Sequence, residues 1–227
     1  MKKYFLQTAS LAIVLFSTST WAQFIPVPTL EESPLRLFVG VDDNNTWSPF
    51  ALQQLQGNAS AVMGLGMGFD FGINLHGGVG QDKGLFTAGN AMQGLIGGDI
   101  MLRYLTNVTD FLYLGLQAQG GYMQNLSMTP MTPNGASIPV DAGLVLGLTF
   151  ADVVHLYANP AFEFGRKSPA DEAKWFGSLI GLNIAAGLAI DMGGTTLVLQ
   201  GKPRWANLSD ASNTFNTAFL VGLAWDL

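Results

Sequence analysis

The sequence predicts an all-β protein: a transmembrane, antiparallel, up-and-down β-barrel of about ten strands. Three observations lead to this prediction. Charged residues make up only 11% of the chain and apolar residues 48%, so there are too few charges to cover a soluble surface. Large apolar residues alternate with small or polar ones along many segments, and this period of two is typical of β-strands with two different faces. The large apolar face continues to the last residue, which suits strands in contact with lipid.

The end of the chain, residues 217 to 227, shows this alternation most clearly. One face carries only large apolar residues, and these are Phe219, Val221, Leu223, Trp225 and Leu227. The segment resembles the closing strand of bacterial outer-membrane β-barrels, where alternating hydrophobic residues lead to a terminal aromatic residue that the assembly machinery recognises. Leu227 stands at that terminal position here. The resemblance is architectural, with no specific family assigned. It implies a location in the cell outer membrane, contact with outer-membrane lipids and recognition by the barrel-assembly machinery.

The start of the chain, residues 1 to 22, predicts a cleaved signal peptide. Two lysines precede a mostly apolar run through Phe16, and small residues stand at Thr20 and Ala22, before the expected cleavage site. The run is shorter than the ~20 apolar residues that a spanning helix needs.

Residues 23 to 34 contain three prolines, which forbid regular structure. We expect a periplasmic lead-in, with folding back into the lumen as a plug as the alternative. The barrel is then expected to comprise residues 35 to 227.

Composition excludes several other classes of protein. The chain has no cysteine, which excludes disulfides and thiolate metal sites, and no metal or cofactor is expected. Without the two lysines of the signal peptide, eight basic residues face sixteen acidic ones, which argues against nucleic acid as a partner. The best candidate for a long apolar helix, residues 175 to 190, is interrupted by glycines. We expect a monomer.

The predicted strands are separated by connections of alternating length. The strands are residues 35 to 42, 59 to 69, 73 to 80, 94 to 105, 111 to 123, 140 to 150, 153 to 165, 175 to 190, 195 to 206 and 217 to 227. The long connections are residues 43 to 58, 81 to 93, 124 to 139, 166 to 174 and 207 to 216, and the short ones are residues 70 to 72, 106 to 110, 151 to 152 and 191 to 194. Short periplasmic turns and long external loops are typical of membrane barrels. The alternative is eight strands, with the first or third segment misread.

The two faces of the strands indicate which one meets lipid. One face carries many glycines, including Gly64, Gly66, Gly68, Gly97, Gly115, Gly143, Gly147, Gly181 and Gly187. A soluble barrel would turn a charged surface to water instead, so we place the glycine face inside. Outward aromatic residues are expected at the two membrane interfaces. Phe69, Tyr104, Phe150 and Trp225 lie toward the short turns, and Tyr122, Phe164, Phe176, Trp205 and Phe219 toward the long connections.

Polar residues on the inner face form the candidate site. The expected polar network comprises Asp99, Gln117, Gln119, Asp141, Asn159, Glu163, Asn183, Lys202 and Arg204. In a closed lumen such acids and bases must pair or meet water. One interpretation is a structural network that fills the barrel. The other is a polar constriction that selects small solutes, because charged rings act in this way in pores.

Catalytic residues are sparse. The only histidines, His76 and His155, are expected near the periplasmic end on non-adjacent strands, and the Gly-x-Ser-x-Gly and His-Glu-x-x-His motifs are absent. We therefore expect a non-enzymatic structural protein that presents surface loops. A narrow pore for small polar solutes is the first alternative, and a lipid-modifying or proteolytic outer-membrane enzyme is the second.

Overall fold

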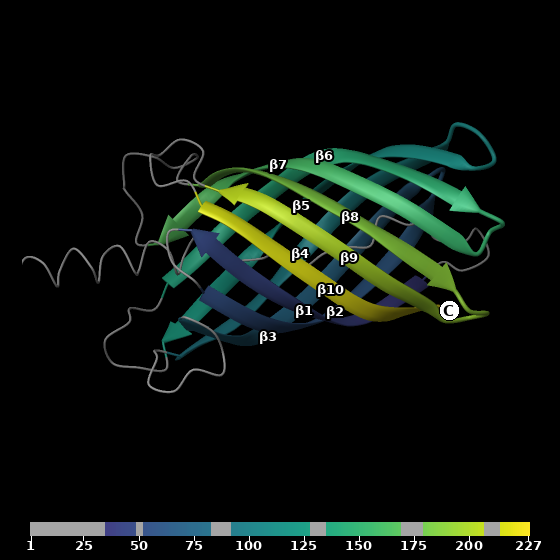
Figure 1. Cartoon of the computed structure of the whole chain (residues 1–227). Coiled ribbons are helices and arrows are strands. Elements are labelled where there is room, and N and C mark those ends of the chain that lie inside the picture. Colours follow the sequence, from purple (N-terminus) through teal and green to yellow (C-terminus); the bar gives the residue numbers. More distant parts are fainter. Residues whose placement is uncertain (1–34, 49–51, 83–91, 128–134, 169–178, 207–213) are drawn as a thin grey trace, which may run out of the picture.

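A closed barrel of ten strands is the architecture of the protein in a computed structural model (Figure 1). The structure describes residues 35–48, 52–82, 92–127, 135–168, 179–206 and 214–227. The expected signal peptide and the expected lead-in lie outside these residues. The strand count confirms the prediction of ten and excludes eight. The described residues contain no helix long and apolar enough to cross a membrane.

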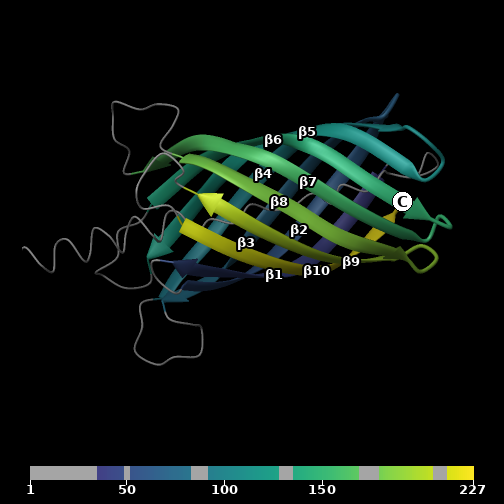
Figure 2. The same ribbon diagram turned by 45° about the horizontal axis from the view of Figure 1, so that its top comes forward.

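Every strand pairs antiparallel with its neighbours in sequence, and β1 pairs with β10 to close the barrel. The strands are β1 Leu35–Ser48, β2 Leu52–Gly66, β3 Phe69–Asp82, β4 Met92–Asn107, β5 Leu112–Ser127, β6 Gly135–Phe150, β7 Val154–Ser168, β8 Leu179–Asp191, β9 Thr196–Ala206 and β10 Thr214–Asp226. Closure leaves no free sheet edge, as a membrane requires of a spanning sheet. The strands are strongly tilted, and the C-terminus lies at the end with the short turns (Figures 1 and 2).

The two faces of the sheet are as different as the alternation predicts. On β1, Val41 is 51% exposed whereas Asp42 is fully buried, and on β6 the contrast is 52% for Leu144 against 0% for Val145. Large apolar side chains cover the outside, and polar, small and aromatic side chains fill the inside. Of the glycines predicted to face inward, Gly64, Gly97, Gly115, Gly143, Gly147, Gly181 and Gly187 lie on the inner face, whereas other strand glycines such as Gly57 face outward.

The predicted loop at residues 43 to 58 is wrong, because most of it is a hairpin of β1 and β2. Asn44 pairs with Gln54, and Asp42 pairs with Gln56. Amide side chains face inward here, while the outward face mixes polar and apolar residues. The side chains still alternate between the two faces, but hydrophobicity does not alternate with them. The strands β3 to β7 and β10 also extend past their predicted limits at this end of the barrel, whereas β9 ends at Ala206 as predicted, and the predicted start of β8 at residues 175 to 178 lies outside the described residues.

The first short turn lies three residues before its predicted place at residues 70 to 72. The chain turns at Met67 and Gly68, so Phe69 belongs to β3. Gly66 at the end of β2 and Gly68 in the turn, both expected on the inner face, are exposed and have φ of 87° and 83°. Consecutive left-handed residues are typical of tight hairpins, and two glycines adopt them without strain. The other short connections lie close to their predicted places.

Three prolines inside strands coincide with gaps in the pairing. The ladders are interrupted beside Pro139 between β5 and β6, beside Pro160 between β6 and β7, and beside Pro203 between β8 and β9. Proline has no N–H to donate and is normally confined to sheet edges, which a closed barrel does not have. The barrel therefore has to compensate at these positions.

Inward-facing rings pack over glycines of the neighbouring strand. An added Cβ on Gly147 would overlap the ring of Tyr113, and one on Gly187 would overlap the ring of Tyr157. The same holds for Gly222 beneath Phe38. Such aromatic cover of glycine is a known device for curving and pinning sheets. The inner glycines thus make room for neighbouring side chains.

Candidate functional site in the barrel lumen

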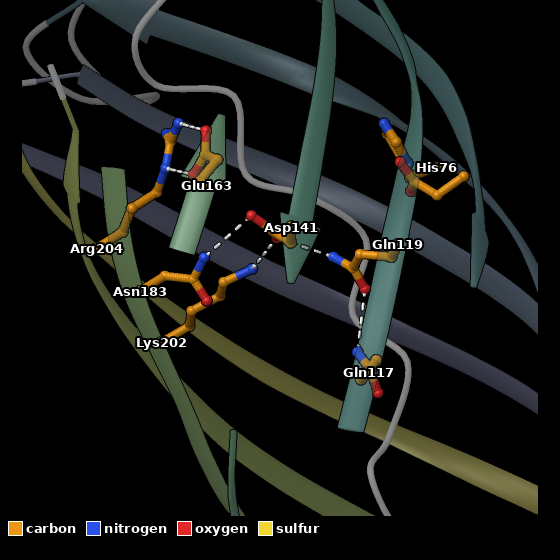
Figure 3. A network of polar contacts seen from close by, with 9 residues as sticks. His76, Gln117, Gln119, Asp141, Glu163, Asn183, Lys202 and Arg204 are labelled. Carbon is orange, nitrogen blue, oxygen red and sulfur yellow. Dashed lines mark hydrogen bonds and ion pairs between the residues drawn. The ribbon is translucent and has the colours of Figure 1, made fainter. Parts of the chain in front are cut away.

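Asp141 is the centre of a hydrogen-bonded network on the wall formed by β5 to β9 (Figure 3). The Gln117 amide donates to Gln119 Oε1 at 3.2 Å, and the Gln119 amide donates to Asp141 Oδ2 at 3.0 Å. Asn183 Nδ2 donates to Asp141 Oδ1 at 3.3 Å, and Lys202 Nζ lies 3.9 Å from Asp141 Oδ2. Both carboxylate oxygens of Asp141 therefore have donors.

A second ion pair, Glu163 with Arg204, adjoins this network. Arg204 Nε donates to Glu163 Oε2 at 2.6 Å, and its terminal nitrogen donates to the other oxygen in a bidentate pair. Asp141 and Glu163 are register partners across β6 and β7. The two adjacent carboxylates are balanced by Lys202 and Arg204, which both come from β9. Balanced, hydrogen-bonded charges are the form in which ions are tolerated away from water.

Two residues expected in this network lie elsewhere on the inner wall. Asp99 has a carboxylate oxygen 3.3 Å from His76 Nδ1 on the neighbouring strand. Asn159 Nδ2 donates to the backbone carbonyl of Leu144 at 2.6 Å. The other seven expected residues contribute to the contacts around Asp141 and Glu163.

The bond of Asn159 repairs the ladder beside Pro160. The register of β6 and β7 places Leu144 opposite Pro160, which has no N–H. The amide of Asn159 supplies the missing donor to the Leu144 carbonyl. Asn159 thus supports the sheet itself.

The sequence did not reveal several further polar pairs on the inner wall. Near the short turns, Arg36 forms a bidentate pair with Asp226 at 2.6 Å, and Arg103 pairs with Asp70 at 2.7 Å. Farther from these turns, Asn58 donates to Asp42 at 3.0 Å and Asn44 donates to Gln54 at 2.9 Å. Asp70 and the amides were missed because they fall in the predicted turn and the predicted loop. Strand register would identify these pairs, and register can be assigned only when the turns are placed correctly.

The side chains of the expected network are shielded from solvent. All nine residues expected in the network are at most 8% exposed, Gln117 being the most exposed of them. Rings of Phe38, Tyr113 and Tyr157 add apolar packing nearer the short turns. The inside of the barrel is therefore a packed polar core.

The two histidines do not share a site. His76 lies in the middle of β3, farther from the periplasmic end than predicted because the preceding turn comes three residues earlier. His155 is near the start of β7, with its Nδ1 3.0 Å from Thr149 Oγ1. Within the described residues, no group of three His, Cys, Asp or Glu side chains could hold a metal ion.

The outer surface carries the residues expected at the membrane interfaces. The ring centroids of Phe69 and Tyr104 lie 4.9 Å apart in a tilted contact beside a short turn, and those of Trp205 and Phe215 lie 5.3 Å apart near the opposite end. Tyr122, Phe150, Phe164 and Phe219 are also exposed and Trp225 is half-buried, while Phe176 lies outside the described residues. Of the expected C-terminal assembly signal, Phe219, Val221, Leu223 and Leu227 face outward with Trp225.

Comparisons with known proteins place this barrel by fold. Neither family models nor curated proteins gave a match to the sequence. Among solved structures, the β domain of the Bordetella autotransporter BrkA aligns with 86% of this chain and 99% of its own, at 10% identity and a TM-score of 0.58. An outer-membrane channel from Pseudomonas putida F1 aligns with 86% of this chain and 97% of its own, at 10% identity and a TM-score of 0.53. The chain therefore has the fold of bacterial outer-membrane β-barrels.

Proposed function

We propose that the protein is a non-enzymatic outer-membrane barrel that presents surface loops. These loops are the connections between strands at the end of the barrel opposite the C-terminus, and this end faces the cell exterior. The observation that carries this proposal is the filled lumen. Asp141 and Glu163 are each bound to basic side chains of β9 and are at most 4% exposed. These buried ion pairs favour a structural role over solute passage, because opening a channel through the lumen would separate them.

The outer face supports the membrane location. Exposed apolar side chains occur on all ten strands, whereas a soluble protein rarely exposes a contiguous apolar surface of this extent. The fold shared with outer-membrane barrels favours the outer membrane, with the short turns in the periplasm. The expected signal peptide agrees with export, and sequencing the mature protein should find Gln23 as its first residue.

Surface presentation is tested with a matched pair of epitope insertions. An epitope placed between β5 and β6 should bind antibody on intact cells, whereas one placed between Met192 and Thr195 should bind only after the outer membrane is permeabilised. The opposite accessibility would reverse the orientation. No accessibility at either position without permeabilisation would contradict presentation at the surface.

A narrow pore for small polar solutes is the second candidate. One observation favours it: Lys202 lies 3.9 Å from Asp141, a looser contact than the other ion pairs, and amides provide the remaining donors to this carboxylate. One of the two similar structures is an outer-membrane channel, although a likeness in fold at 10% identity does not transfer that activity. The constriction in this case would be the network around Asp141.

Planar-bilayer recordings separate the two candidates. The wild-type protein should give no discrete conductance steps, whereas the variant with Glu163→Ala and Arg204→Ala should give small ones. This variant removes an ion pair without changing net charge, and its steps would prove that the protein inserts. Wild-type steps that change with Lys202→Ala would favour the pore instead.

The non-enzymatic proposal has its own test. In the described part of the chain, the contact that most resembles a nucleophile–base pair is that of Thr149 Oγ1 with His155 Nδ1. Among the described residues, no carboxylate lies within ion-pair distance of this imidazole. The purified protein should turn over neither phospholipids nor peptides. Turnover abolished by His76→Ala or His155→Ala would overturn the proposal.

A further inference from the structure

A diagonal row of polar side chains runs across the wall opposite the Asp141 network. Asp42 on β1 accepts a hydrogen bond from Asn58 on β2 at 3.0 Å, and Asn58 is the register partner of His76 on β3. His76 Nδ1 in turn lies 3.3 Å from Asp99 on β4. We name Asp42, Asn58, His76 and Asp99 the acidic row. Figure 3 shows His76 apart from the residues that bind Asp141.

Among the buried carboxylates that the structure describes, those of Asp42 and Asp99 have no Lys or Arg nitrogen within ion-pair distance. Among the side chains that the structure describes, four inward basic groups are engaged elsewhere, in the pairs Arg36–Asp226, Arg103–Asp70, Lys202–Asp141 and Arg204–Glu163. Lys202 also acts on Asp42 electrostatically, but its closest carboxylate is that of Asp141. Asp42 and Asp99 thus carry up to two negative charges that these pairs do not balance, and His76 beside them can offset at most one.

Several atoms of the acidic row are buried without a hydrogen-bond partner. They are Asp42 Oδ1, Asn58 Oδ1, His76 Nε2 and both oxygens of Asp99, although Asp99 Oδ2 is the oxygen that lies 3.3 Å from His76 Nδ1. The four side chains are at most 4% exposed. Apart from the imidazole nitrogen, these atoms are all acceptors, so what complements them is a positive charge or a donor. A buried carboxylate left without either is costly.

We propose that the acidic row binds a small monovalent cation. A divalent metal requires several oxygen ligands that converge on one point. The carboxylates here come from β1 and β4, which are not adjacent, and the described residues form no group of three acidic or imidazole ligands. A sodium, potassium or ammonium ion, which needs fewer charged ligands, suits the Asp42 and Asn58 oxygens, which one hydrogen bond holds together. This site is independent of whether the barrel presents loops or conducts solutes.

The test is the thermal midpoint of unfolding of the mature protein in detergent micelles at constant ionic strength. Choline chloride is replaced stepwise by sodium, potassium or ammonium chloride. A ligand that binds only the folded state raises the midpoint with its concentration. We expect one or more of the small cations to raise it by about 2 to 4 °C at about five times the dissociation constant. Choline, which is larger and carries no N–H, should have no such effect.

The double variant with Asp42→Asn and Asp99→Asn should lose this cation-dependent rise. In choline its midpoint should equal or exceed that of the wild type, because the uncompensated charges are gone. The control is Asp43→Asn, which removes the same charge one residue away on the outer face and should keep the rise. If the double variant does not fold, each single variant is measured, and at least one should lose the rise.

Three results would overturn the proposal. The first is a midpoint that choline raises as much as the small cations do, which indicates screening alone. The second is a rise that survives in the double variant or in both single variants. The third is the absence of any rise with sodium, potassium and ammonium.

Discussion

Asn159 and Pro160 show at the scale of single residues how the barrel accommodates a proline in a central strand. Pro160 leaves the Leu144 carbonyl without its ladder donor, and the neighbouring asparagine supplies an amide at 2.6 Å. Asn159, which the sequence pattern assigned to the lumen network, thus hydrogen-bonds the backbone instead. Such bonds contribute to stability because a carbonyl in a barrel wall that lacks its ladder donor has no water to hydrogen-bond instead.

Asn159→Ala should lower the free energy of unfolding by about 1 to 3 kcal/mol, the cost of leaving a buried acceptor without a partner. Pro160→Ala restores an N–H at the right place, so it should recover most of that loss in the Asn159→Ala background. The measurement is a double-mutant cycle by urea unfolding in lipid vesicles. Strictly additive effects would show that the two residues do not serve the same carbonyl.

At the scale of the strand, packing between neighbours explains why the inner face is rich in glycine. Rings of Tyr113 and Tyr157 and the imidazole of His76 lie over Gly147, Gly187 and Gly97 of adjacent strands. Each contact joins two strands through a side chain as well as through the ladder. The same contacts fill the volume that glycine would otherwise leave to water.

Gly147→Ala should destabilise the barrel by about 1 to 3 kcal/mol, because the added methyl group overlaps the Tyr113 ring. Gly57→Ala is the matched control. At that position an added Cβ meets only the Gly77 carbonyl oxygen at 3.9 Å, so its effect should stay within about 0.5 kcal/mol. Equal losses in urea unfolding would show that ring packing over glycine is not the cause.

The turns supply a second prediction for the elements. Ala151 has a φ of 50°, which a side chain disfavours, and Gly193 has a φ of 83° with no atom within 4 Å of an added Cβ. Ala151→Gly should therefore stabilise the protein by about 0.5 to 1 kcal/mol, and Gly193→Ala should destabilise it by about 1 kcal/mol. Thermal unfolding compares the two, and a change of the same sign in both would contradict the assignment to backbone strain.

At the scale of the whole molecule, the barrel is inside out relative to a soluble protein. Most of its inward charges are paired, and its large aliphatic side chains lie outside. Exclusion of water from both sides of the wall makes every backbone group depend on the ladder, which explains the closure of β1 on β10. The depth of an outward residue in the bilayer then determines the cost of a charge there.

Leu75→Arg should cost about 2 to 4 kcal/mol in lipid vesicles, because Leu75 faces outward from the middle of β3. Met67→Arg places the same charge in a short turn and should cost at most about 1 kcal/mol. The free energy of unfolding in vesicles gives the comparison. Similar small costs at both positions would argue against the membrane-facing assignment of the outer surface.

Strand number and facing could be predicted from the sequence because they follow from a period of two, whereas the predicted long connection at residues 43 to 58 was wrong. Val39 and Val41 on one face, with Phe38 and Gly40 on the other, suffice to orient β1. The site was predictable only as a set of inward polar residues. That set included Asp141, Glu163, Lys202 and Arg204. The sequence did not predict which acidic residue pairs with which basic one.

Pairing could not be predicted because it depends on where each turn lies and on the stagger between strands. A displacement of three residues in the first turn put Asp70 opposite Arg103 and moved His76 to mid-barrel. Local sequence determined the two faces of every apolar strand, since facing needs only neighbours along the chain. The tertiary structure alone decided that His76 lies beside Asp99 and that glycines are covered by rings, because these contacts join residues far apart in sequence.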